Sequence, residues 1–181
     1  MPPSRPRQPN PTSGKGSSLP PPSRSDRIDV QVAPRYAGAI RATAIRSAAR
    51  AALDAVRARP LPPRAGGAGG GSLAIVVTGD ATLRRLNRDF AGVDAPTDVL
   101  SFESGEPGEY LGDVMISAPR ARAQAKRGGH PFIDEMRLLV IHGVLHLLGY
   151  DHDTPGRKKR MWAAQAKALR TVKASIEGPT Q

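Results

Sequence analysis

Three of the four histidines of this 181-residue chain fall within eleven residues, in the segment IHGVLHLLGYDHD. His142 and His146 are four residues apart, so on a helix both rings project from one face and can share one ion. A third ring cannot follow on the next helical turn without crowding that face. Gly149 readily adopts a left-handed conformation, which lets the chain turn back toward His152. The spacing therefore predicts a helix, a turn and a metal site with ligands His142, His146 and His152.

The number of histidines indicates what kind of metal site this is. Structural zinc sites normally fill all four positions with protein ligands, whereas catalytic sites keep one open for water or substrate. The chain has no cysteine, so thiolate ligands are excluded. Three imidazoles also suit nickel, copper and iron, but tetrahedral geometry and availability favour one Zn²⁺ ion. The alternative is that each histidine makes hydrogen bonds of its own, which is what we expect for the isolated His130.

The spacing H-x3-H-x2-G-x2-H is also that of the metzincin metalloproteases, in which a Glu directly after the first His is the general base. That position is Gly143 here, so a water molecule would lack its proton acceptor for peptide hydrolysis. A protease is therefore the lesser alternative. Asp151, beside the third histidine, is a candidate proton acceptor, although an Asp at such a place is more often a turn residue.

Hydrophobic periodicity predicts the elements around this segment. We expect strands at 28–32, 73–77, 98–102 and 113–117, with the continuous apolar run LAIVV in a central strand covered on both faces. Helices are expected at 36–56, from about 80 to 90, at 118–127, from Pro131 to about Leu147 and at 155–172. The prediction is an α+β fold in which about five helices pack on a small mixed four-stranded sheet in a single domain.

The composition of the ends and of one internal segment sets the expected domain limits. Residues 1–26 are rich in Pro, Ser and Arg with little to bury, which predicts a disordered tail. The folded domain should cover 27–176, with 59–72 as a flexible Pro/Gly loop insertion and 177–181 as a short C-terminal tail. No apolar run is long enough for a membrane span or a signal sequence, so we expect a cytoplasmic protein that does not contact a membrane.

The charge of the chain favours an anionic partner. Lys and Arg outnumber Asp and Glu by 27 to 16, a formal charge of +11, which attracts phosphate polymers and makes nucleic acid the favoured partner. Candidate substrate-binding groups are cations near the predicted site and hydroxyls on or next to a strand that could border it. Each has an ordinary alternative, a solvated helix face or a sheet-edge hydrogen bond. The candidates are Arg84, Arg85, Arg88, Thr97, Ser101, Arg157 and Lys158.

The segment HGVLHLLGYDH resembles the signature of the YbeY family of bacterial endoribonucleases. LNRDFAGVDAPTDVLSF (Leu86 to Phe102) and YLGDVMIS (Tyr110 to Ser117) are similar to two further blocks of that family, in the same order, over roughly residues 73 to 165. The resemblance implies a zinc-dependent hydrolase, with the three histidines as ligands, that cleaves single-stranded RNA. It further implies maturation of ribosomal RNA, especially the 3′ end of the small-subunit RNA, and a part in late ribosome assembly and quality control, with the small subunit or assembly factors as partners.

Two positions depart from the family pattern. Many members have an Arg, implicated in RNA cleavage, where this chain has Ala91, between Phe90 and Gly92. The helix after the third histidine is basic, where many relatives carry acidic residues. A competing function is therefore a ribosome-assembly protein that uses zinc only to hold its fold. The missing Arg favours that function and the open three-histidine site opposes it.

Overall fold

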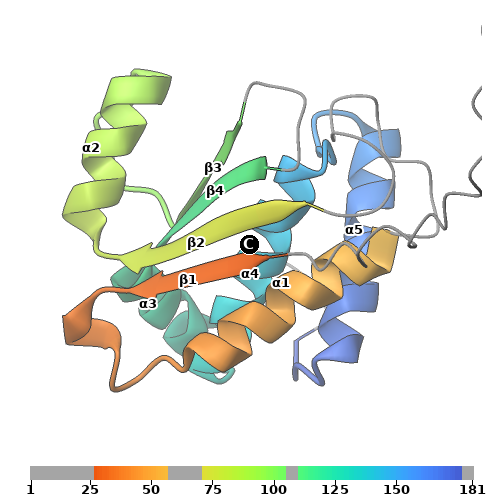
Figure 1. Ribbon diagram of the computed structural model, residues 1–181, viewed down its shortest axis with the longest axis horizontal. Coiled ribbons are helices and arrows are strands. Elements are labelled where there is room, and N and C mark those ends of the chain that lie inside the picture. Colours follow the sequence, from red (N-terminus) through yellow and green to blue (C-terminus); the bar gives the residue numbers. More distant parts are fainter. Residues whose placement is uncertain (1–26, 57–70, 105–109, 177–181) are drawn as a thin grey trace, which may run out of the picture.

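The computed structural model describes residues 27–56, 71–104 and 110–176, which form one mixed sheet with helices on both of its faces (Figure 1). The order of the strands is β1-β2-β4-β3, in which β1, β2 and β4 run parallel and β3 is antiparallel to β4. The α+β prediction is confirmed. The elements are β1 (Ile28–Val32), a 3-10 helix η1 (Pro34–Tyr36), α1 (Ala42–Val56), β2 (Ser72–Thr78), α2 (Asp80–Ala91), β3 (Val99–Glu103), β4 (Tyr110–Ser117), α3 (Ala118–Gly128), α4 (Phe132–Leu147) and α5 (Pro155–Thr171).

The core lies between the sheet and the layer of α1, α4 and α5. Leu73, Ile75 and Val77 of β2 point into it and are fully buried, while the side chains that alternate with them are only half-buried. β2 is central in the sheet, as predicted, because it pairs with β1 and β4. The prediction that it is covered on both faces is wrong, since helices bury only one face of it completely.

α4 is buried nearly all round, because it packs on the sheet and also on α1, α3 and α5. Residues that recur at helical spacing on one face of α4 are buried, but so are residues on its other faces, among them Ile141. Those of the first face are Met136, Leu139, Val140, Val144 and Leu147. Close packing on nearly all sides restricts the movement of the helix. The histidines at its C-terminal end are therefore held on a closely packed element.

The helix predicted to begin at Tyr36 begins at Ala42 instead. Tyr36 closes the short helix η1, and turns continue from it to Ile40, whose side chain is only 3% exposed. These turns replace continuous helix and bury Ile40 in the hydrophobic core. Phe90, near the end of α2, is 73% exposed although it is apolar, and it packs edge-on against Phe102 with ring centroids 5.1 Å apart.

The predicted loop insertion at 59–72 falls mostly outside the described residues, and its last member, Ser72, is the first residue of β2. Both predicted tails, 1–26 and 177–181, also lie outside them. None of the helices among the described residues is long and apolar enough to cross a membrane.

Candidate metal centre

The C-terminal end of α4 positions the three histidines. His142 and His146 project from its last two turns, and the amides of Gly149 and Tyr150 donate back to the carbonyls of His146 (2.8 Å) and Leu145 (3.0 Å). Gly149 has a φ of 78°, a left-handed conformation that a side chain would strain. The predicted turn is confirmed, and it directs the chain back so that His152 faces the end of the helix.

The ring nitrogens of His142, His146 and His152 come together at one point. One nitrogen from each ring lies within 4.8 Å of the other two, and the Nε2 atoms of His142 and His146 are 3.2 Å apart. Two nitrogens bound tetrahedrally at zinc–nitrogen distances would be about 3.4 Å apart. The group contains no carboxylate and no fourth histidine from the described residues. Three imidazoles at this spacing therefore fit one metal ion with an open position.

Two of the histidines, His142 and His146, are held in the form that binds metal. Burial, reinforced by the neighbouring His142 and His152 rings, lowers the pKa of His146 to about 4. Burial also lowers the pKa of His142, against the opposing effect of a hydrogen bond from the ring to Gln165. Both rings are consequently neutral at pH 7, with lone pairs free for an ion.

Gln165 of α5 sets the orientation of the first histidine, and sequence reasoning missed it. Its side chain is 2% exposed and its Oε1 lies 3.1 Å from Nδ1 of His142. An amide oxygen can only accept, so Nδ1 carries the proton and Nε2 is left unprotonated toward the other two rings. The signal was available in the sequence: Gln165 interrupts the otherwise apolar buried stripe of α5, which contains Met161, Ala168 and Leu169.

Gly143 is a packing residue of the site. A Cβ atom at this position would lie 2.5 Å from Cγ1 of Val114 and 3.2 Å from Oγ of Ser101, so α4 approaches the sheet too closely for any side chain. The Ser101 hydroxyl donates to the Gly143 carbonyl at 3.0 Å, which ties β3 to α4. A glutamate side chain has no room here, and the general base of a metzincin cannot occupy this position.

The loop that carries His152 is pinned by charged groups. Oδ1 of Asp151 accepts the backbone amide of His152 at 2.7 Å, and this hydrogen bond, helped by Arg157, lowers the pKa of Asp151. Arg157 reaches Asp153 at 2.7 Å and Asp151 at 3.4 Å. Asp151 is thus used as a turn residue, and Arg157 clamps the loop against the start of α5.

Trp162 is a second residue that sequence reasoning missed. Its ring lies 5.9 Å from the ring of His152, and Nζ of Lys158 lies 4.5 Å from the centre of the indole. An aromatic surface and an exposed cation therefore border the most exposed of the three histidines. Of the predicted substrate-binding residues, Arg157 contacts the loop that carries His152, and Lys158 lies over Trp162 beside it.

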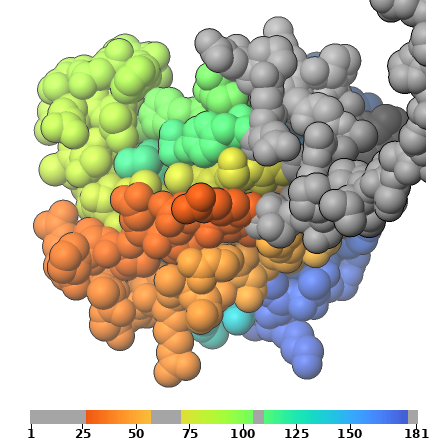
Figure 2. Space-filling model, viewed as in Figure 1, coloured from red at the N-terminus to blue at the C-terminus, as the bar shows by residue number. Residues whose placement is uncertain are grey.

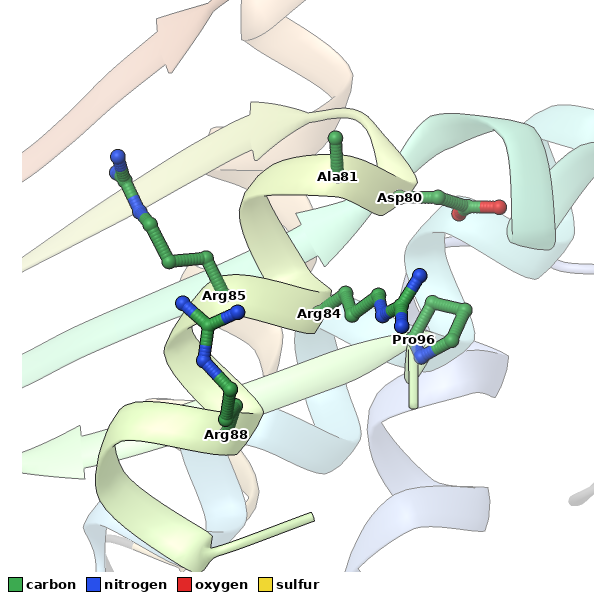
Figure 3. Close-up of a pocket in the computed structure, with 6 residues that line it drawn as sticks. All are labelled: Asp80, Ala81, Arg84, Arg85, Arg88 and Pro96. Carbon is green, nitrogen blue, oxygen red and sulfur yellow. The ribbon is translucent and has the colours of Figure 1, made fainter. Parts of the chain in front are cut away.

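The arginines of α2 lie elsewhere. Phe102 meets Phe90 of α2 on the sheet face opposite to the one that Ser101 presents to α4, so α2 and the histidines occupy opposite faces. Arg84 forms a bidentate ion pair with Asp94 at 2.7 and 2.8 Å, and Arg88 pairs with Asp89. Figure 3 shows Arg84 extending toward Pro96 while Arg85 points the other way, with no ion pair to any residue that the structure describes.

Thr97 and His130 both have local partners. The Thr97 hydroxyl donates to Oδ1 of Asp98 at 3.2 Å, and Asp98 also accepts from the Val99 amide and from Gln124. Thr97 therefore belongs to the network that starts β3. His130 is buried 2.6 Å from Glu135 and takes no part in the histidine group, as predicted.

The fold and the site together define a small α+β protein with a three-histidine centre at the end of a buried helix. A model of the family described as "Endoribonuclease YbeY" matches residues 37–173. The chain belongs to the endoribonuclease YbeY family, which confirms the resemblance noted in the sequence.

Individual relatives agree with this assignment. The endoribonuclease YbeY of Roseiflexus castenholzii is 40% identical over 161 residues, which cover 83% of this chain and 96% of the relative. That of Brevibacillus brevis is 42% identical over 119 residues, covering 56% of this chain and 75% of the relative. The solution structure of a Thermotoga maritima protein matches with a TM-score of 0.54 and 23% identity, covering 80% of this chain and 88% of that one. This last similarity shows the fold alone.

Proposed function

We propose that this chain is a metal-dependent endoribonuclease that cleaves single-stranded RNA at one zinc ion held by His142, His146 and His152. The observation that carries the proposal is the meeting of three ring nitrogens within 4.8 Å, with no further ligand among the described residues. The similar proteins of Roseiflexus castenholzii and Brevibacillus brevis are endoribonucleases, and this supports the reaction class. Zinc is the ion that three neutral imidazoles and an open tetrahedral position suit best.

The substrate we propose is ribosomal RNA, in particular the 3′ end of the small-subunit RNA, during late ribosome assembly and quality control in the cytoplasm. The resemblance of the three sequence blocks to the family supports this choice. The formal charge of +11 also suits a polyanionic substrate. The small subunit or its assembly factors are the expected partners.

Each side chain around the metal centre has a separate role in such a reaction. Zinc, when bound, supplies a water of lowered pKa and polarises a phosphoryl oxygen. Gln165 holds His142 in the tautomer that presents Nε2, and Arg157 holds the loop that brings His152 into place. Lys158 offers a positive charge to a phosphate and Trp162 offers a face on which a base can stack. Asp151 stays ionised and fixes the amide of His152.

Cleavage of a single-stranded ribosomal RNA fragment by the zinc-loaded protein tests the proposal, with His146→Ala beside it. We expect the variant to lose both bound metal and cleavage. His130→Gln is the matched control, because His130 is outside the histidine group, and it should keep both. Cleavage that persists in His146→Ala at the level of the unsubstituted chain would rule out the zinc mechanism, and metal analysis of the purified protein would identify the ion.

A zinc-containing assembly factor without nuclease activity is the second candidate, because Ala91 stands where relatives carry an Arg. It predicts that the protein and His146→Ala both bind RNA and that neither cuts it. A metzincin-like protease is the third, and it predicts zinc-dependent peptide products from casein. The lack of space at Gly143 opposes this last reading.

A further inference from the structure

A basic groove lies at the end of the helical layer opposite to the histidines. It is formed by the outer side of α1, the first turns of α4 and the end of α5. In Figure 2, α1 (orange) and α5 (blue) run along the lower side of the molecule, with part of α4 (cyan) exposed between them. Five cations and a single carboxylate line the groove: Arg41, Arg46, Arg50, Arg137, Lys173 and Asp54.

The groove and the metal centre are connected by two rigid helices. Ile133, in the groove, and His146, in the centre, are thirteen residues apart on α4, which corresponds to about 20 Å at the helical rise. α5 spans the same interval, because Lys158 near its start borders the centre and Thr171 at its end lines the groove. The distance between the two sites is thus fixed by the fold.

The positive charge of the groove is only partly neutralised within the protein. Arg137 pairs with Asp134 at 2.8 Å. Arg46 donates to the carbonyl of Ile28 at 3.2 Å, a bond that leaves its charge uncompensated. Arg41 and Lys173 are exposed and make no ion pair with any residue in the described part of the chain. The groove therefore presents a net positive charge to solvent.

The remaining lining indicates which anion would fit. Hydroxyls of Thr43, Ser47 and Thr171 stand among the cations, and no aromatic ring is present in the lining. Hydroxyls and guanidinium groups are the usual donors to phosphate oxygens, whereas reading or stacking of bases requires base-edge donors or aromatic platforms. This composition suits a phosphate backbone without regard to its sequence.

We propose that the groove is a second RNA-binding site, which holds the phosphate backbone of the same strand whose scissile bond lies at the metal centre. This inference rests on the proposed function for the RNA ligand and for the position of the scissile bond. At about 3.4 Å per stacked nucleotide, a strand must extend about six nucleotides beyond the centre to reach the groove. RNA shorter than this should contact one site at a time, and longer RNA should engage both.

Binding is measured with the full-length chain and fluorescently labelled single-stranded RNA, in the presence of EDTA so that the RNA stays intact. The variant Arg41→Gln/Lys173→Gln removes the two exposed, unpaired cations. We expect the plot of log affinity against log salt for RNA of about twelve nucleotides to become shallower by about 1.4, the value for two lost phosphate contacts on a single strand. The change should be smaller for RNA of about four nucleotides, because RNA of that length can occupy only one of the two sites at a time.

The matched control is Arg122→Gln/Lys126→Gln, which removes the same charge from the exposed side of α3. An equal loss of RNA affinity in both double variants, with unchanged thermal midpoints, would show that only the net charge of the protein matters. It would rule out the groove as a specific RNA-binding site. Poly-glutamate serves as a probe for an acidic protein partner. If the groove variant binds poly-glutamate more weakly but binds RNA as well as the unsubstituted chain does, the RNA proposal is wrong and an acidic protein is the partner. A salt dependence that changes in the groove variant, in a chain that never cleaves RNA, would support the groove as an RNA-binding site and reject the nuclease.

Discussion

Nδ1 of His142 lies 3.1 Å from Oε1 of Gln165, and this one hydrogen bond joins α4 to α5 at the histidine group. Gln165 is buried, so no water molecule can take over its place without a change in packing. Because the bond fixes which ring nitrogen carries the proton, it links the packing of two helices to the availability of a metal ligand.

Gln165→Leu should weaken zinc binding about 10- to 100-fold, the usual effect of removing a partner that orients a metal-ligating histidine. Nδ1–H would be left buried without an acceptor, and the ring would no longer be held in one orientation. Competition with a chromophoric chelator measures the affinity. Gln165→Glu keeps an acceptor oxygen and should bind zinc more tightly than the Leu variant; equal affinities for all three proteins would show that the contact does not position the ligand.

Gly143→Ala should destabilise the fold by about 1–3 kcal/mol, the usual cost of overpacking a core. The added methyl would meet Cγ1 of Val114 at 2.5 Å, so β4 and α4 must separate locally. Urea denaturation gives the change in free energy of unfolding. Gly156→Ala, where nothing lies within 4 Å, is the control and should be neutral or slightly stabilising because it favours helix in α5. A neutral Gly143→Ala variant would contradict the close approach.

The stability of the fold should decrease in acid through Asp134. Burial raises the pKa of Asp134, but hydrogen bonds from the amide and hydroxyl of Ser175 and from Arg137 outweigh it, so its net pKa is below the ordinary value of 3.8. A carboxyl whose pKa is lower in the folded state contributes stability above its unfolded pKa and loses it as the pH falls. The loss is therefore expected below about pH 4.

Asp134→Asn tests this by removing the titrating group. Its free energy of unfolding should be lower by about 1.5–3 kcal/mol at pH 7, in the range for hydrogen bonds to a charged group, and should depend less on pH between 5 and 3. Parallel pH curves for the two proteins would show that Asp134 is not the group that titrates.

Ala91→Arg should strengthen RNA binding. Residue 91 ends α2 and is exposed, so a long side chain can be accommodated without displacing any packed group. One additional phosphate contact on a single strand would make the salt dependence steeper by about 0.7. Ala91→Gln adds length without charge and should leave the salt dependence unchanged; a similar gain in both variants would show that length rather than charge is responsible.

Local patterns predicted a large part of this structure. Some features depend only on residues close together in the chain, where periodicity and the conformational freedom of glycine act directly. They are the four strands, the end of α4 before Gly149 and the turn to His152. The predicted helix start at Tyr36 was wrong because turns at this point bury Ile40 in the core, a tertiary contact that helical periodicity does not report. Phe90 of α2 is exposed although it is apolar, because α2 packs on only a small part of the sheet.

The sequence by itself determined the three histidines, their spacing and the turn that brings them together, because all of these lie on one helix and the loop that follows it. Only the tertiary structure decided how the site is supported. Gln165 lies 23 residues from His142, and Ser101 lies 42 residues from Gly143. Contacts between elements so far apart in the chain follow from how the helices and the sheet pack. Hydrophobic periodicity along the chain does not report such contacts. For this reason the basic groove and the separation of α2 from the metal centre could be seen only in the tertiary structure.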